Sequence, residues 1–105
     1  MPDNYALKFT PIANDDVDQI YQYIVERLYA PKAAHDLMED IENSILRLKD
    51  FPYSGSPVAD DILRGRGYRK LLIKNYIVFY LIDEAEKQVV IMRVFYGARQ
   101  YDKLL

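Results

Sequence analysis

Apolar residues recur at helical spacing in the segment that follows Thr10 and Pro11. The members of this stripe are Val17, Ile20, Tyr21, Ile24 and Leu28. A threonine followed by proline is typical of a helix start, because the hydroxyl accepts an orphan amide hydrogen bond and proline has no amide to leave unbonded. The pattern predicts a helix that begins after Thr10 and ends before Pro31.

A second amphipathic stripe begins near Pro31 and ends at Phe51-Pro52. Its apolar members are Ala34, Leu37, Met38, Ile41, Ile45 and Leu48. The connection between the two stripes is only a few residues long, which forces neighbouring helices to lie antiparallel. We expect residues 11–50 to form a helical hairpin whose apolar face is buried against a sheet.

Four segments have the apolar pattern of β-strands, and they are residues 5–10, 68–74, 76–82 and 88–95. Lys74-Asn75 predicts a tight hairpin, and the polar residues 83–87 predict a second hairpin connection. Turn-forming residues predict a loop at 52–57, followed by a short helical turn at 58–63 and, after the last strand, a short helix or tail at 98–105.

These elements predict an α+β fold in a single domain of residues 1–105. The three C-terminal strands form an antiparallel meander, the N-terminal strand lies at an edge or beside the last strand, and the helical hairpin covers one face. Strands 76–82 and 88–95 are almost continuously apolar, which is typical of strands covered on both faces. The pattern does not assign the element that covers the second face.

The composition fits one small domain, with 105 residues, 50% of them apolar, and no cysteine. The lack of cysteine excludes a disulfide scaffold and thiol catalysis, and it favours a reducing compartment. The N-terminal residues do not resemble a secretion signal, and no apolar run approaches the roughly 20 residues of a membrane-spanning helix. We therefore expect a soluble protein of the cytoplasm that does not bind membranes.

The net charge of −2 is the sum of the charges of two modules that have opposite signs. Residues 1–61 hold 5 Lys and Arg against 12 Asp and Glu, and residues 62–105 hold 9 against 4, so the modules carry −7 and +5. A nucleic acid or an acidic protein segment would be attracted to the second module only.

Conventional catalytic groups are scarce in the sequence. The single histidine, His35, lies among acidic residues on the exposed side of the second predicted helix, and no spacing resembles a metal-ligand set. Gly65-Arg66-Gly67 precedes a strand instead of opening a helix, so it predicts a turn and not a phosphate loop. The sequence predicts no metal and no cofactor.

Cationic and phenolic side chains are concentrated after residue 61. They are Arg64, Arg66, Arg69, Lys70, Lys74, Arg93 and Arg99, with Tyr68, Tyr76, Tyr80, Tyr96 and Tyr101. Such a set can hold a phosphodiester and stabilise a developing oxyanion, although tyrosine is also a good strand former and basic residues commonly protect strand edges. Arg93 interrupts an apolar strand, so it needs either a helix carboxylate or an anionic ligand.

Several segments together resemble the RelE/ParE superfamily of bacterial type II toxins. They are Phe9-Thr10-Pro11-Ile12-Ala13, Ile20-Tyr21-Gln22-Tyr23-Ile24, Tyr68-Arg69-Lys70-Leu71, Tyr76-Ile77-Val78-Phe79-Tyr80 and the ending that starts at Arg93 and contains Gly97 and Arg99. The resemblance implies the growth-arresting toxin of a plasmid-stabilising toxin–antitoxin pair. It also implies a cognate antitoxin that wraps the toxin in a hetero-oligomer and supplies the missing cover for the second face of the sheet.

The superfamily contains two mechanisms. RelE-like members cleave mRNA on the ribosome, and the resemblance then implies Lys70, Arg93 and Arg99 as phosphate clamps, with Tyr96 or Tyr101 for proton transfer. ParE-like members inhibit DNA gyrase, and they lack the full set of basic and tyrosine residues that RelE-like members use for cleavage. In either case, the residues expected to bind the target or the antitoxin are Arg64, Arg66, Arg69, Lys74 and Tyr80.

The sequence favours the ParE-like branch. Ile77 stands where RelE-like nucleases place an arginine, and the ending Arg-Val-x-x-Gly-x-Arg from Arg93 to Arg99 is closer to the ParE-like pattern. The acidic helical module also suits a protein target better than ribosomal RNA. A ribosome-dependent nuclease and a non-toxic module that only binds antitoxin stay open as alternatives.

Overall fold

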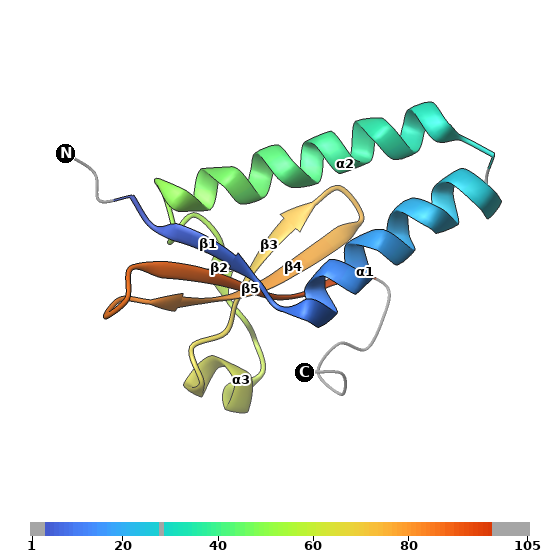
Figure 1. Cartoon of the computed structure of the whole chain (residues 1–105). Helices are drawn as coiled ribbons and strands as arrows, with labels where there is room; N and C mark the ends of the chain where they lie inside the picture. The colour runs from blue at the N-terminus through green and yellow to red at the C-terminus, as the bar shows by residue number, and fades with distance from the viewer. Residues whose placement is uncertain (1–3, 28, 98–105) are drawn as a thin grey trace.

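The computed structural model describes residues 4–27 and 29–97. Figure 1 shows the helices α1 (Pro11–Gln22) and α2 (Pro31–Leu46) on one side of the sheet and α3 (Asp61–Gly65) on the other side. The elements in chain order are β1 (Ala6–Phe9), α1 (Pro11–Gln22), the π-helix η1 (Tyr23–Arg27), α2 (Pro31–Leu46), the 3₁₀-helix η2 (Arg47–Lys49), β2 (Ser56–Pro57), α3 (Asp61–Gly65), β3 (Arg69–Ile73), β4 (Tyr76–Asp83) and β5 (Gln88–Tyr96). This arrangement confirms the predicted α+β fold.

The first helix begins as its sequence predicts. Thr10 is extended and its Oγ1 accepts the Ala13 N–H at 3.1 Å, which satisfies one orphan donor of the first turn. The helix is α-helical only to Gln22 and continues as a π-helix through Arg27. The assignment of Tyr21 to the buried stripe was wrong, because this side chain is 42% exposed and the fully buried member of the helix is Ala13.

The second helix follows its predicted pattern closely. Ala34, Leu37, Ile41 and Ile45 are buried on α2, and Leu48 in the following 3₁₀ turn is fully buried. Ala30 precedes the helix without a side-chain cap, and Pro31 occupies the first turn, where its missing N–H leaves no unbonded donor. None of the helices among residues 4–27 and 29–97 is long and apolar enough to cross a membrane.

The sheet has five strands in the order β1-β5-β4-β3-β2. The three predicted meander strands pair antiparallel, and Lys74-Asn75 forms the predicted tight turn between β3 and β4. The N-terminal strand is both an edge strand and the neighbour of the last strand, and it runs parallel to β5, so the sheet is mixed. The strand β2 was not predicted, because its two residues, Ser56 and Pro57, are too few to show an alternating pattern.

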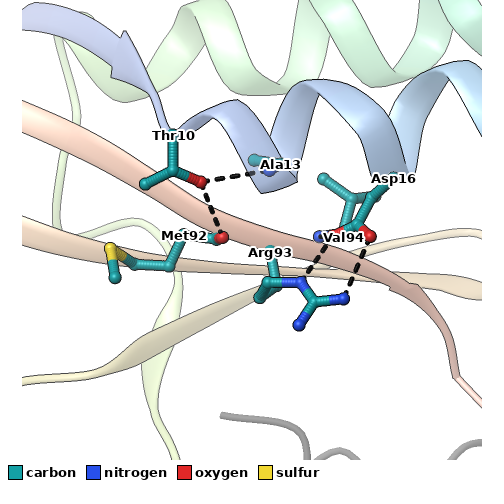
Figure 2. A network of polar contacts seen from close by, with 6 residues as sticks. All are labelled: Thr10, Ala13, Asp16, Met92, Arg93 and Val94. Carbon is teal, nitrogen blue, oxygen red and sulfur yellow. Dashed lines mark hydrogen bonds and ion pairs between the residues drawn. The ribbon is translucent and has the colours of Figure 1, made fainter.

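A β-bulge changes which side chains of β5 face the helices. Phe79 pairs with Arg93 and Tyr80 with Ile91, so Met92 is an extra residue in β5. The Met92 carbonyl accepts a 3.0 Å hydrogen bond from the Thr10 hydroxyl, which joins the bulge to the start of α1 (Figure 2). After the bulge Val94 joins the core beneath the helices, and Phe95 joins the core on the other face.

Two hydrophobic cores lie on opposite faces of the sheet. The larger core joins β1, β4 and β5 to both long helices through fully buried residues such as Val78, Val89 and Ile91. The smaller core consists of Val58, Leu63, Ile77, Phe79 and Phe95, with Tyr68 packed against it. The expectation that an antitoxin segment must supply the second cover was therefore wrong in part, because the loop before α3 and α3 itself cover this face.

Candidate functional site

The predicted binding residues near α3 lie at its C-terminal end. Arg64 forms an ion pair with Asp61 one turn earlier, and both side chains are more than half exposed. Arg66 is exposed in the turn that it forms with Gly67, whose φ is +89°, and Gly65 is the last residue of α3. The predicted turn is therefore found at Arg66-Gly67. Both arginines are exposed and therefore accessible to an anionic partner. Figure 1 shows α3, which contains Arg64, on the face of the sheet opposite α1 and α2.

Arg69 fixes the loop between η2 and β2. One of its terminal nitrogens donates to the Gly55 carbonyl at 2.7 Å and to the Tyr53 carbonyl at 3.2 Å, and its guanidinium stacks on the Tyr53 ring, 5.1 Å from the centroid. These contacts assign Arg69 a structural role in the free protein. Lys70 is half-buried beside it on β3 and makes no ion pair with a described residue.

Lys74 joins the β3–β4 turn to α2. Its Nζ lies 2.7 Å from Asp40 Oδ2, and this hydrogen bond and the negative charge of Asp40 raise the pKa of Lys74. The ammonium group is therefore engaged in an internal ion pair, although more than half of the side chain is exposed. A surface pair of this kind contributes about 0–1 kcal/mol, so an acidic partner could exchange for Asp40 at little cost.

Tyr80 was predicted to bind the target or antitoxin, and the structure corrects this prediction. Its side chain is fully buried in the core under the helices. The Tyr80 hydroxyl donates to the Pro52 carbonyl at 2.8 Å and accepts the Gly55 N–H at 3.1 Å, so it anchors the loop to the centre of the sheet. A tyrosine in a strand can be placed on the buried or the exposed face only when the register is known.

We expect Tyr80→Phe to destabilise the protein by about 1–3 kcal/mol, because the Gly55 N–H and the Pro52 carbonyl lose their buried partner. Urea unfolding would measure the change. Tyr53→Phe is the matched control, since Tyr53 is 55% exposed and the change should stay within about 0.5 kcal/mol. Equal stability of the two variants would show that the Tyr80 hydroxyl does not hold the loop.

Arg93 forms an ion pair with a helix carboxylate, which was one of the two partners predicted for it. Its Nε and one terminal nitrogen donate to Asp16 at 2.8 and 3.1 Å, and the same carboxylate accepts the Val94 N–H at 3.0 Å (Figure 2). The two side chains are only 18% and 11% exposed. The guanidinium also lies over the Phe95 ring, 4.4 Å from the centroid. Asp16 thus neutralises Arg93 and ties α1 to β5 just beyond the bulge.

An open groove lies between the far half of the helical hairpin and the ends of β4 and β5. Its volume is about 780 Å³, and we call it the tyrosine groove after Tyr23, Tyr76 and Tyr96 in its wall. The other residues of the wall include Ile20, Ile24, Leu37 and Val94. Tyr76 and Tyr96 contact each other edge to face, with centroids 5.7 Å apart. Burial, with nearby Tyr96 and Tyr23, raises the pKa of Tyr76.

The tyrosine groove was not predicted from the sequence, although Tyr76 and Tyr96 were among the candidate residues. The groove requires residues of α1, η1 and α2 to lie opposite the start of β4 and the end of β5, and a residue pattern does not encode this arrangement. A detectable signal in the sequence was the position of Tyr23 outside the apolar stripe of the first helix, and the structure shows this side chain 55% exposed. Tyr96 lies in the groove wall and is half exposed, so it is accessible to a partner that enters the groove.

Several predicted residues are not part of any site that the structure describes. Arg99 and Tyr101 lie outside the described residues. His35 is exposed on α2, with Nε2 3.8 Å from Glu39 Oε2, as expected for a solvated side chain. No group of three or more side chains that could hold a metal ion occurs among residues 4–27 and 29–97.

The chain was compared with known families and structures. The family model of the ParE toxin of the type II toxin–antitoxin system, parDE, matches residues 7–101. A chain of the chromosomal ParDE toxin–antitoxin system from P. aeruginosa superposes with a TM-score of 0.72 and 24% identity, covering 88% of this chain and 95% of that one. A chain of the toxin–antitoxin complex RelBE2 from Mycobacterium tuberculosis superposes with a TM-score of 0.62 and 22% identity. The match covers 89% of this chain and 98% of that one. No curated protein sequence matches.

Proposed function

We propose a target for this chain on the premise that it belongs to the ParE toxin family of type II toxin–antitoxin systems. The chain is thus the toxin of such a system, and the resemblance found in the sequence is confirmed. We infer that it arrests growth by binding DNA gyrase in the cytoplasm, and that it is not an RNA-cleaving enzyme. Its expected partner is a cognate antitoxin, since both structural neighbours come from toxin–antitoxin complexes.

The observation that carries this proposal is the ion pair between Arg93 and Asp16. A guanidinium that clamps a scissile phosphate must present its charge to the developing oxyanion. Two nitrogens of Arg93 instead donate to a carboxylate, and that carboxylate would repel a phosphate brought to the same place. The RelE-like role of Arg93 is therefore disfavoured by its own partner.

Two further features support a protein target. Ile77, at the position where RelE-like nucleases place an arginine, is only 8% exposed and belongs to the smaller core. The charge of −7 over residues 1–61 belongs mainly to the helices, which would be repelled by ribosomal RNA within about 8–10 Å at physiological salt.

The test combines two activities measured on the same preparation. We expect the toxin, freed from its antitoxin, to inhibit supercoiling of relaxed plasmid by gyrase and to leave mRNA on translating ribosomes uncut. In cells, induction without antitoxin should lower thymidine incorporation before amino-acid incorporation falls. Arg99→Ala should retain gyrase inhibition if this residue serves only a nuclease.

Cut transcripts with normal supercoiling would refute the proposal and support ribosome-dependent cleavage. Normal growth and normal activity in both assays would also refute it, and would support a non-toxic module that only binds antitoxin. A gyrase ATPase control would exclude general inactivation of the target enzyme by impurities.

A further inference from the structure

The connection between the two long helices contains a residue with a strained backbone. Tyr29 has a φ of +51°, in the left-handed region that bulky side chains avoid. The N–H of the next residue, Ala30, donates to the Ile24 carbonyl at 3.3 Å and caps the end of η1. A left-handed residue before such a bond is typical of helix C-termini, where glycine is the usual choice because it has no Cβ. The backbone therefore requires the left-handed conformation at this position, but it does not require a tyrosine.

The side chain of Tyr29 does not offset this strain in the free protein. It is 86% exposed, and it forms no hydrogen bond or ring contact with a described residue. Lys74 and Lys87 also have a positive φ, but Lys74 pairs with Asp40 and Lys87 lies over the Tyr5 ring. Strained residues that persist in a fold are concentrated at functional sites. The unused side chain of Tyr29 therefore points to a contact outside this chain.

The residues around Tyr29 hold its backbone in place. Ile24 is buried in the larger core, and Ala30 packs against the same core. Figure 1 shows this end of the helical hairpin projecting beyond the sheet. An aromatic side chain on an anchored, projecting backbone loses little conformational freedom when it enters a partner. Tyrosine is also one of the residue types that dominate the binding energy of protein interfaces.

The charges beside Tyr29 favour a protein partner over a nucleic acid. Glu26 and Arg27 are exposed on the preceding turn, and neither forms an ion pair with a described residue. One charge of each sign next to an aromatic ring resembles the polar rim of a protein interface. A phosphate backbone would instead need an excess of positive charge.

We propose that Tyr29 is the anchor through which the toxin binds gyrase. Its ring enters an apolar pocket on the surface of the enzyme, and its hydroxyl forms a hydrogen bond with a polar group of that pocket. The inference rests on the proposed function, because it names gyrase as the partner. It assigns target binding to the end of the acidic helical hairpin.

Tyr29→Gly tests the anchor, because its expected effects on folding and on binding have opposite signs. Glycine adopts the left-handed conformation without strain, so the folding equilibrium constant should stay the same or rise by up to about tenfold. The loss of the ring should weaken binding to the gyrase holoenzyme by about tenfold or more. The toxin concentration that halves supercoiling should rise by the same factor. Urea unfolding, biolayer interferometry and the supercoiling assay would measure these three quantities.

Lys87→Gly is the matched control for the backbone. It relieves the same kind of strain at an exposed residue of the β4–β5 turn and should leave gyrase binding unchanged. Tyr29→Ala keeps a Cβ in the left-handed conformation, so it should lose binding as Tyr29→Gly does without the same gain in stability. Tyr29→Phe retains the ring and should bind within about fivefold of the wild type.

Three results would overturn the anchor. The first is a Tyr29→Gly variant that binds and inhibits gyrase as the wild type does. The second is a Tyr29→Gly variant that is less stable than the wild type, which would show that the side chain serves the fold. The third is weaker binding of Tyr29→Gly to the antitoxin with unchanged binding to gyrase, which would assign the tyrosine to the antitoxin.

The wild-type toxin separates failure of this inference from failure of the proposed function. A wild type that neither binds nor inhibits gyrase would refute the target, and the anchor with it. A wild type that inhibits gyrase, together with a Tyr29→Gly variant that inhibits it equally, would refute the anchor alone.

Discussion

Gly55→Ala is expected to destabilise the protein by about 3–5 kcal/mol, the largest effect of any substitution considered for this chain. A Cβ at this position would lie 2.4 Å from the Lys70 carbonyl oxygen and 2.6 Å from the Tyr80 hydroxyl oxygen. Neither atom can move easily, because the first belongs to the backbone of β3 and the second to a fully buried side chain.

The substitution would also disturb the hydrogen bonds that hold the loop. Gly55 donates its N–H to the Tyr80 hydroxyl and accepts from Arg69 at 2.7 Å, so a displaced backbone loses both contacts. Because this loop leads to β2 and then to the cover of the smaller core, we expect the second face of the sheet to open together with it.

Gly65→Ala is the matched control for this prediction. A Cβ at Gly65 meets no atom within 4 Å, and the residue lies in the last turn of α3. Alanine should be neutral there or stabilise the helix by up to about 1 kcal/mol. The melting temperature and urea unfolding of both variants would measure the difference. Similar stability of the two variants would show that the Gly55 contact relaxes at little cost.

Asp16→Asn is expected to cost about 2–4 kcal/mol, because it removes the charge that compensates a largely buried guanidinium. Both carboxylate oxygens of Asp16 accept hydrogen bonds from Arg93, and one of them also accepts the Val94 N–H. The asparagine amide has only one acceptor oxygen, and its NH₂ group cannot accept a hydrogen bond. We expect the loss to separate α1 from β5 near the bulge.

Asp15→Asn provides the control, since Asp15 is an exposed neighbour on the same helix and should change stability by less than about 0.5 kcal/mol. A double variant, Asp16→Asn with Arg93→Met, should recover part of the loss, because the largely buried guanidinium is removed together with the carboxylate that it binds. Urea unfolding of the wild type, Asp16→Asn, Arg93→Met and the double variant gives the coupling. An Asp16→Asn variant as stable as Asp15→Asn would contradict the role of the pair.

The local elements of the fold could be predicted because they depend on neighbours in sequence. Thr10 caps α1 as predicted, and Lys74-Asn75 closes the β3–β4 hairpin as predicted. The helical turn predicted at 58–63 is found at Asp61–Gly65 as α3, since Asp60 is the residue whose side chain caps it, through the Leu63 N–H. These features need only backbone chemistry within a few residues.

The roles of individual side chains were harder to predict. The need of Arg93 for a carboxylate or an anion was evident, but the choice of Asp16 depends on how α1 crosses β5, 77 residues away in sequence. Tyr80 was placed at the binding surface because its phenol is a plausible ligand group, and the register instead buries it. The positions of Arg99 and Tyr101 lie outside the described residues, and their roles stay predictions.

The two helices, the meander strands, the opposed charges of the two modules and the family resemblance follow from the amino-acid sequence, because periodicity, caps, turns and charge depend on residues that are close together in the chain. The parallel pairing of β1, the bulge at Met92, the partner of Arg93 and the tyrosine groove became evident in the folded protein alone. Each of these depends on contacts between distant segments, whose geometry is fixed when the helices pack on the sheet.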